Sequence, residues 1–240
     1  MKKSAFVIAA VVMYITVNQQ TFAQKSFAGT VTFETKYEGD TDPQKHKTHE
    51  AIYSIFENKT KQSLSGGGVS QHVITNGDDL SVTVLLDISG LGRYGKITKK
   101  NKEDMFKDVK ISFVDRGDSK NICGFECKGY DVTLVDMGEI DEDDEDDVKE
   151  IKFIVYTTKE IGKDDNINAF QFPGLSGYPL YIELEVKDVK QITQAKEVKK
   201  GKVKAVDFLV PSDYKMFDND EDWNQEMERL NEAYKKMQGQ

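Results

Sequence analysis

The chain has 240 residues and carries 42 acidic against 33 basic side chains, which gives a formal net charge of −9 at pH 7. This acidic balance argues against a nucleic-acid-binding protein, because phosphate contacts need clustered Lys and Arg, and against electrostatic docking on anionic lipid. The length allows one large β domain or two small ones.

The first 23 residues have the pattern of a secretory signal peptide. A basic start precedes an apolar run over 5–17, and Thr21-Phe22-Ala23 has small residues at the two positions, 21 and 23, where signal peptidase needs them. The run is about 13 residues long and a bilayer span needs about 20, which makes an anchoring helix the weaker alternative. We expect a mature chain that begins at Gln24, has no lipid anchor and is soluble in the periplasm, with secretion beyond the outer membrane as an open alternative.

Beyond residue 26 the dominant pattern is alternation of apolar and polar residues with a period of two, which is typical of half-buried strands. The predicted strands are 27–37, 49–56, 69–75, 80–87, 109–115, 126–136, 149–158, 180–187, 189–198 and 202–210. Asn76-Gly77 predicts a hairpin, and Lys200-Gly201 separates the last two strands. Many short strands without helices between them predict an antiparallel all-β sheet or barrel.

One helix is predicted at the C-terminal end of the chain. Asp218, Asn219 and Asp220 are suitable N-caps. A single apolar stripe follows at helical spacing, formed by Trp223, Met227, Leu230, Tyr234 and Met237. The stripe is most simply core that packs on the sheet; a movable lid over a cavity and a partner-binding helix are the alternatives.

A long sheet with one apolar face needs a cover, and the helix and the loops around 90–106 and 159–177 are the candidates. Incomplete cover would leave an apolar groove, and such grooves bind apolar ligands. The candidate lining is Phe33, Val82, Val84, Val132, Leu134, Phe153, Val155, Ile182, Leu184 and Phe208. The alternative is that these positions are ordinary core.

Residues 139–147 read EIDEDDEDD, with eight carboxylates in nine positions. Such a run repels itself, so we predict a solvated hairpin loop. Weak binding of a divalent cation is the alternative, with ligands Asp141, Asp143, Asp144 and Asp146. The three histidines, His46, His49 and His72, are predicted to lie at the surface, because no zinc-ligand spacing surrounds them.

The only cysteines are Cys123 and Cys127. An oxidising compartment permits a disulfide, but the i, i+4 spacing requires a tight loop between them, since on one continuous strand they would be about 13 Å apart. A disulfide and two free thiols both stay open. Arg116-Gly117-Asp118 spells an adhesion tripeptide, but its turn chemistry favours a plain turn.

Motifs for catalysis are absent from the sequence. It contains no GxSxG, SxxK or HExxH, and the glycines at 66–68 lack the Lys-Ser/Thr of a phosphate-binding loop. The sequence therefore favours a protein that is not an enzyme and has no cofactor.

Two stretches resemble a known group of proteins. Residues 121–130, NICGFECKGY, resemble the I-x-G-x-x-C-x-x-Y strand of small exported β proteins of Gram-negative bacteria, and residues 172–180, FPGLSGYPL, resemble their later GL-x-G turn. These proteins include the GLPGLI family, and their pattern is similar to that of LolA/LolB-like lipoprotein carriers. The resemblance implies a curved antiparallel sheet, an incomplete barrel of about 9–11 strands, whose concave face is covered by a helix and encloses a cavity for acyl chains.

Together these features predict three segments: a signal peptide over 1–23, a LolA-like β domain over 24–215 with its acidic loop, and an amphipathic helix over 216–240. The predicted function is non-enzymatic binding or carriage of a lipid or other apolar ligand in the periplasm. The alternative is an envelope structural or interaction protein with a filled core and no ligand, whose partners would be envelope proteins.

Overall fold

A computed structural model describes residues 26–39, 48–101, 109–136, 150–186 and 189–237. The predicted signal peptide, the acidic loop with its candidate cation ligands, and His46 lie outside these residues. Among the helices of the described part, none has the length and apolar character that a bilayer crossing requires.

Twelve strands form one sheet, and its spatial order is β12-β6-β5-β4-β3-β2-β1-β11-β10-β9-β8-β7. Every neighbouring pair is antiparallel except β12 and β6, which run parallel. The sheet is not closed, since β7 and β12 stand at its two edges. In chain order the strands are β1 (Ala28–Gly39), β2 (His49–Phe56), β3 (Lys59–Gly66), β4 (Val69–Asn76), β5 (Ser81–Ile88), β6 (Gly92–Lys99), β7 (Val109–Ile122), β8 (Phe125–Asp136), β9 (Glu150–Thr158), β10 (Tyr178–Val186), β11 (Val189–Lys200) and β12 (Lys215–Phe217).

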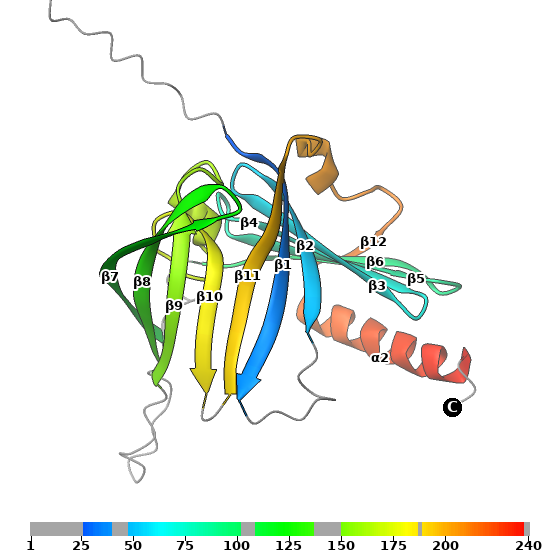
Figure 1. Ribbon diagram of the computed structural model, residues 1–240. Coiled ribbons are helices and arrows are strands. Elements are labelled where there is room, and N and C mark those ends of the chain that lie inside the picture. The colour runs from blue at the N-terminus through cyan, green and yellow to red at the C-terminus, as the bar shows by residue number, and fades with distance from the viewer. Residues whose placement is uncertain (1–25, 40–47, 102–108, 137–149, 187–188, 238–240) are drawn as a thin grey trace, which may run out of the picture.

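The predicted fold class, mainly β with an open antiparallel sheet and one C-terminal helix, is confirmed, although the strand number exceeds the expected range. Figure 1 shows that β7 to β11, β1 and β2 stand side by side, whereas β3 to β6 run across them. The sheet therefore curves strongly, and the helix α2 (Asp220–Met237) lies beneath β3 to β6.

The sequence does not predict β3 or β6. The loop predicted over 90–106 is wrong where β6 occupies Gly92–Lys99. The β3 sequence KTKQSLSG is polar at both sets of alternate positions, and the β6 sequence GRYGKITK holds two glycines and two lysines. Each strand has a hydrogen-bonded neighbour on both sides. Backbone pairing holds these two strands in place, and it leaves no alternation of apolar residues in the sequence.

The strand predicted over 202–210 is also wrong, because this segment forms the 3-10 helix η2 (Ala205–Phe208). Gly201 and Lys202 have φ values of 89° and 70°, which turn the chain out of β11. The Lys204 N–H then donates to Asp207 Oδ2 at 2.7 Å and closes the turn. The local turn geometry outweighs the alternating pattern of the sequence.

The N-terminus of α2 is capped as the sequence predicts. The Asp222 N–H donates to Asn219 Oδ1 at 2.8 Å, and Asn219 Nδ2 donates to Asp222 Oδ2 at 2.9 Å. Three acidic residues occupy the first turn and two lysines the last, which complements the helix dipole.

Candidate ligand-binding face

The strand registers sort the side chains of the sheet into two sides. Residues directly opposite one another in a ladder point to the same side, so Val132, Phe153 and Leu184 share one side across β8, β9 and β10. Continuing the registers through β1 to β5 places nine of the ten predicted lining residues on this side, which we call the inner face: Phe33, Val82, Val84, Val132, Leu134, Phe153, Val155, Ile182 and Leu184.

Phe208 is the exception, because it lies on the opposite, outer side of the sheet. It packs in η2 against Ile74 and Leu85, whose positions alternate with those of Val73 and Val84 on β4 and β5. Phe208 therefore anchors the segment after β11 and does not contribute to the inner face.

One part of the inner face is covered by the loop 159–177, as the sequence predicts. Phe172 and Leu175 pack on Val132 and Val155, and all four side chains are buried. The Phe153 and Phe172 rings meet edge to face with centroids 5.6 Å apart. The loop contains the short 3-10 helix η1 (Asp165–Asn168).

A buried asparagine ties this loop to the far half of the sheet. Asn58, 1% exposed in the turn between β2 and β3, donates from Nδ2 to Asp78 Oδ1 and to Asp164 Oδ1, both at 2.8 Å. Its Oδ1 accepts the N–H groups of Lys163 and Asp164 at 3.1 and 3.2 Å. The loop therefore bridges from β9 to the turns of β2–β3 and β4–β5.

The predicted hairpin at Asn76-Gly77 is present, but its glycine has a different role from the one expected in a two-residue turn. The connection runs over 77–80, and Leu80 is the residue there with positive φ, at 52°. A Cβ on Gly77 would lie 1.9 Å from the carbonyl oxygen of Asn166. Gly77 therefore allows the loop 159–177 to approach the sheet closely.

The other cover of the inner face is α2. Leu230 is 2% exposed and lies in a cluster with Ile88, Tyr94 and Phe217. The other predicted lid residues whose side chains are described, Trp223, Met227 and Tyr234, are partly buried against the same cluster. The Met237 side chain lies outside the described residues, and whether the helix is fixed core or a lid stays a prediction.

Between these two covers the inner face is half-buried and mixes apolar with polar side chains. Tyr53, Val73, Val84 and Leu184 are of intermediate exposure there. The registers place three polar residues of intermediate exposure on the same side: Gln62, Thr75 and Gln191.

An aromatic group stands at the centre of the inner face. The Phe33 ring lies 5.6 Å from that of Tyr53 and 6.3 Å from that of Tyr178. Burial raises the pKa of both tyrosine hydroxyls above their usual value. The hydroxyls of Thr35 and Thr193 bond each other at 2.9 Å. Phe33, Thr35 and Tyr178 are buried, so this part of the inner face is packed core.

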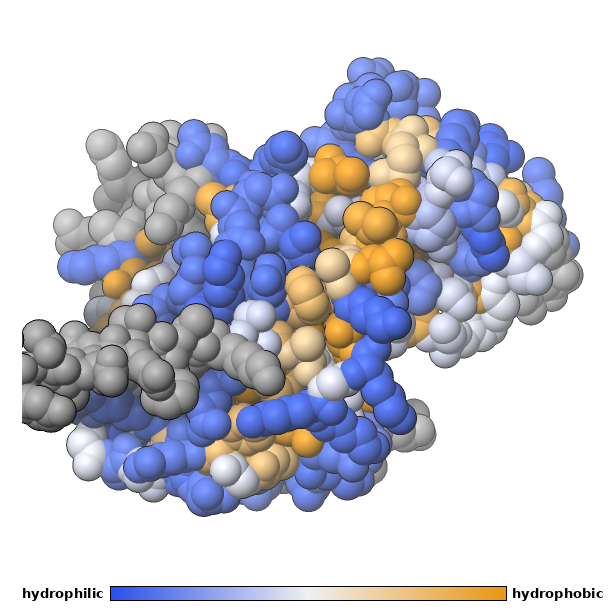
Figure 2. Space-filling view, turned by 90° about the horizontal axis from the view of Figure 1, so that it is seen from above, coloured by the Kyte–Doolittle hydropathy of each residue, from blue (hydrophilic) through white to orange (hydrophobic). Residues whose placement is uncertain are grey.

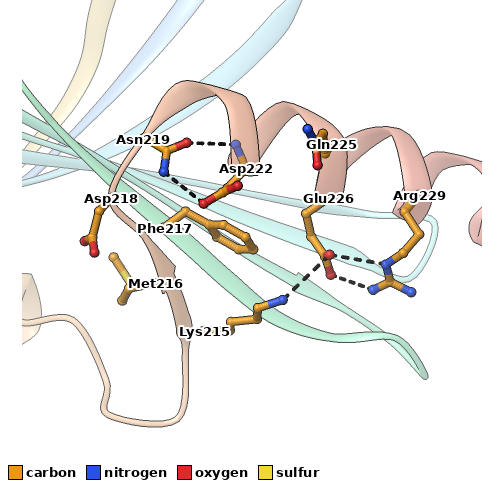
Figure 3. A pocket seen from close by; sticks show the side chains of 9 residues that line it. All are labelled: Lys215, Met216, Phe217, Asp218, Asn219, Asp222, Gln225, Glu226 and Arg229. Atoms are coloured by element: carbon orange, nitrogen blue, oxygen red, sulfur yellow. Dashed lines mark hydrogen bonds and ion pairs between the residues drawn. The ribbon is translucent and has the colours of Figure 1, made fainter.

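Two surface hollows are lined mainly by polar and charged residues. The first, of about 550 Å³, lies between β12 and α2, and Figure 3 shows Glu226 there between Lys215 and Arg229, at 3.7 and 2.5 Å. The hydrogen bond from Arg229 holds the pKa of the Glu226 carboxyl below its usual value. The second, of about 520 Å³, is lined by charged residues of β7 and β8 and includes Gly117 and Asp118. Neither hollow is the apolar groove that the sequence predicts.

The Arg116-Gly117-Asp118 tripeptide lies in β7 at a register shift of the β7–β8 ladder. Arg116 forms ion pairs with Asp131 and Asp118, and Asp118 Oδ2 accepts the hydroxyl of Tyr156 at 2.8 Å. Both charged side chains are therefore bound to the protein's own surface. The plain turn that the sequence predicts here is wrong, because the tripeptide is an irregularity within one continuous strand.

The two cysteines are free thiols. Cys123 and Gly124, with φ values of 52° and 86°, form the turn between β7 and β8, and Cys127 is buried on β8. The Cys123 thiol contacts the carbonyl oxygen of Ala195 at 3.3 Å. Burial raises the pKa of Cys127 to about 11.

Within the described part of the chain, no group of three or more His, Cys, Asp and Glu side chains is arranged to hold a metal ion. Of the histidines, His72 lies within hydrogen-bonding distance of Ser63, at 2.7 Å from Nδ1 to Oγ. Burial holds the pKa of His72 below its usual value.

No protein-family model matches the chain, and no curated protein matches its sequence. Among solved structures it is similar to PNGF-II, with a TM-score of 0.50, 13% identity and coverage of 81% of this chain. The chain spans about a third of PNGF-II, 32% of its length. It also matches a LolA superfamily protein from Nitrosomonas europaea (TM-score 0.31, 7% identity, 78% of this chain and 91% of that one). A further match is an outer membrane lipoprotein-sorting protein domain from Vibrio parahaemolyticus (TM-score 0.24, 5% identity, 76% and 89%). At these identities the similarity to PNGF-II describes the fold alone.

Proposed function

We propose that this chain is a non-enzymatic, exported protein that binds or carries a lipid or other apolar ligand on the inner face of its sheet. One observation carries the proposal: between the loop 159–177 and α2, the inner face presents half-buried aliphatic and aromatic side chains from strands on both sides of β1. A curved sheet with covers at two places and half-buried aliphatic side chains between them supports a site for an acyl chain there.

The energetics favour an aliphatic occupant. Each methylene of a bound chain that leaves water contributes about 0.8 kcal/mol, and the half-buried side chains of Val84 and Leu184 would lose their remaining contact with water at the same time. Affinity would then rise with the length of the acyl chain.

The compartment and the ligand class rest on the sequence. The N-terminal pattern of residues 1–23 supports export to the periplasm, and the resemblance of 121–130 and 172–180 to exported carriers supports an apolar cargo.

The test is titration of the protein with a dansyl-labelled fatty acid, whose fluorescence rises in an apolar site. Val73→Glu and Leu184→Glu, both on the inner face, should each weaken binding at least about tenfold, since a carboxylate with no lysine directly opposite it in either neighbouring strand would then meet the acyl chain. Val114→Glu is the matched control, because Val114 is 62% exposed on the outer side. Equal binding by all three variants would refute a site on the inner face.

The alternative, an interaction protein, is favoured by one feature of the sheet. β7 is a 14-residue edge strand with a neighbour on one side only, and such an edge accepts a further strand from a partner. A wild-type protein that binds no fatty acid in this titration would move this alternative ahead of ligand carriage.

A further inference from the structure

The segment between β11 and β12 carries two of the most exposed large apolar side chains of the described residues. Val206 is 60% and Leu209 is 65% exposed, and we call this pair the apolar tip. Figure 1 shows η2 projecting at one end of the molecule, and the view onto that end in Figure 2 has hydrophobic residues gathered among hydrophilic ones. Exposed apolar side chains on a projecting segment are typical of a contact surface.

The apolar tip is held firmly by the rest of the protein. The Gly201 N–H donates to the carbonyl oxygen of Ala28 at 2.6 Å, and Lys61 Nζ donates to that of Asp207 at 3.1 Å. Phe208, 7% exposed, inserts between Ile74 and Leu85. The buried Phe208 thus fixes the backbone from which its two neighbours in the tip point into solvent.

Lysines precede the tip in the chain. Between residues 198 and 210 the chain has four lysines and a single acidic residue, Asp207. Lys202 and Lys204 are exposed and form no ion pair with any other described residue, and Lys200 Nζ lies over the Phe125 ring at 5.0 Å. We call Lys200, Lys202 and Lys204 the basic flank. This segment of an otherwise acidic protein is therefore positively charged.

We propose that the apolar tip and the basic flank dock the protein peripherally on an anionic lipid surface. Each lysine near such a surface contributes about 1 kcal/mol, and apolar side chains that enter the boundary between headgroups and acyl chains add to this. At physiological salt concentration, the interaction between charges is screened beyond about 8 Å. Docking therefore depends on the local lysines. The net negative charge of the whole chain, by itself unfavourable for binding to anionic lipid, has little effect at this distance.

Docking of this kind is reversible, since two apolar side chains and three lysines give only a marginal anchor. It is independent of the proposed ligand site, because the tip belongs to a segment that packs on the outer side of the sheet. A protein that binds no fatty acid can still dock, and the two proposals fail separately.

The experiment is co-sedimentation with vesicles of phosphatidylcholine, alone or with about 30 mol% phosphatidylglycerol. The protein is purified from the envelope fraction of an expressing Gram-negative host, and its N-terminus is fixed by mass measurement. We expect it to sediment with the anionic vesicles at low salt, to be released at high salt, and to stay in solution with phosphatidylcholine alone. Equal binding to both vesicles, or binding to neither, would overturn the proposal.

Two double variants assign the contact. Val206→Asp with Leu209→Asp, and Lys202→Glu with Lys204→Glu, should each lower the bound fraction at least about fivefold. The control is Val114→Asp with Lys152→Glu, two exposed residues of β7 and β9, which should bind like the wild type. All these positions are exposed, and unchanged circular dichroism spectra establish that the variants are folded. Wild-type binding by either tip or flank variant, or an equal loss in the control, would refute the assignment.

Discussion

Replacing Leu230 by alanine tests whether α2 is a fixed part of the fold. Among the described side chains of the helix Leu230 is the most buried, at 2% exposure, and it contacts the cluster of Ile88, Tyr94 and Phe217. If the helix is core, the substitution leaves a cavity at the centre of its contact with the sheet. If the helix is a lid, it moves away at little cost.

The magnitude follows from the side chain that is removed. Truncation takes away about three methylene-sized groups at about 0.8 kcal/mol each, or about 2.4 kcal/mol. Incomplete relaxation around the cavity adds to this, and measured losses for such truncations are about 2–5 kcal/mol. We expect the free energy of unfolding to fall by about 3 kcal/mol.

The assay is urea denaturation followed by two probes. Trp223, the only tryptophan of the chain, lies in α2 with its ring 5.7 Å from that of Phe217, so its fluorescence reports the docking of the helix. Far-UV circular dichroism reports the sheet. In the wild type and in Leu230→Ala the two transitions should coincide.

The matched control is Leu209→Ala, because Leu209 is 65% exposed. It should change the free energy of unfolding by less than about 0.5 kcal/mol. A loss below about 1 kcal/mol for Leu230→Ala, with the tryptophan transition ahead of the dichroism transition, would refute the core reading and support a lid.

Three further predictions concern other parts of the molecule. Asn58→Ala should lower the free energy of unfolding by about 2–4 kcal/mol, because four hydrogen bonds to the loop and turns are lost; a smaller effect in urea denaturation would show that they do not hold the loop. Gly77→Ala should cost about 1–3 kcal/mol, because its Cβ would meet Asn166, whereas Gly66→Ala, which meets nothing within 4 Å, is the neutral control. The pKa of Cys127 is about 11 in the folded protein, above its ordinary 9.0. Between these two pH values the thiol ionises in the unfolded chain but stays protonated in the folded one, so the free energy of unfolding should fall as pH rises through this interval. Cys127→Ala should remove that part of the slope, and an unchanged slope in urea titrations from about pH 8 to pH 10.5 would contradict the assignment.

The sequence predicts on which side of the sheet a residue lies wherever apolar and polar residues alternate along a strand. Val82 and Val84 lie on one side and Thr83 on the other, as a period of two requires. The same logic holds in β8 and β10, and for this reason the predicted lining residues of the strands fall on a single face. Local periodicity is enough, because the side of a strand residue does not depend on distant contacts.

The sequence does not predict those contacts that join residues far apart in the chain. Asn58 bonds to Asp164, 106 residues away, and nothing near Asn58 distinguishes it from any asparagine in a turn. Gly77 resembles the glycine of a two-residue hairpin, but the carbonyl group of Asn166 is the reason for its lack of a side chain. Contacts between distant loops leave no periodic trace in either sequence.

Averages over the chain also conceal local features. The net charge of −9 gives no indication of the four lysines that gather before η2. The apolar alternation of 202–210 resembles a strand, yet the positive φ of Gly201 and Lys202 turns the chain away and leaves Val206 and Leu209 exposed. Glycine permits this turn, but the sequence does not show that the chain takes it.

The most direct test of the central claim, an apolar site on the inner face, is photolabelling with a fatty acid that carries a diazirine on its acyl chain. Mass spectrometry of the digested protein then locates the attached label. The account predicts labels on Val73, Val84 or Leu184, between the loop 159–177 and α2, and their loss in the presence of excess unlabelled fatty acid. Labels confined to the outer side of the sheet, or none that the unlabelled acid displaces, would contradict it.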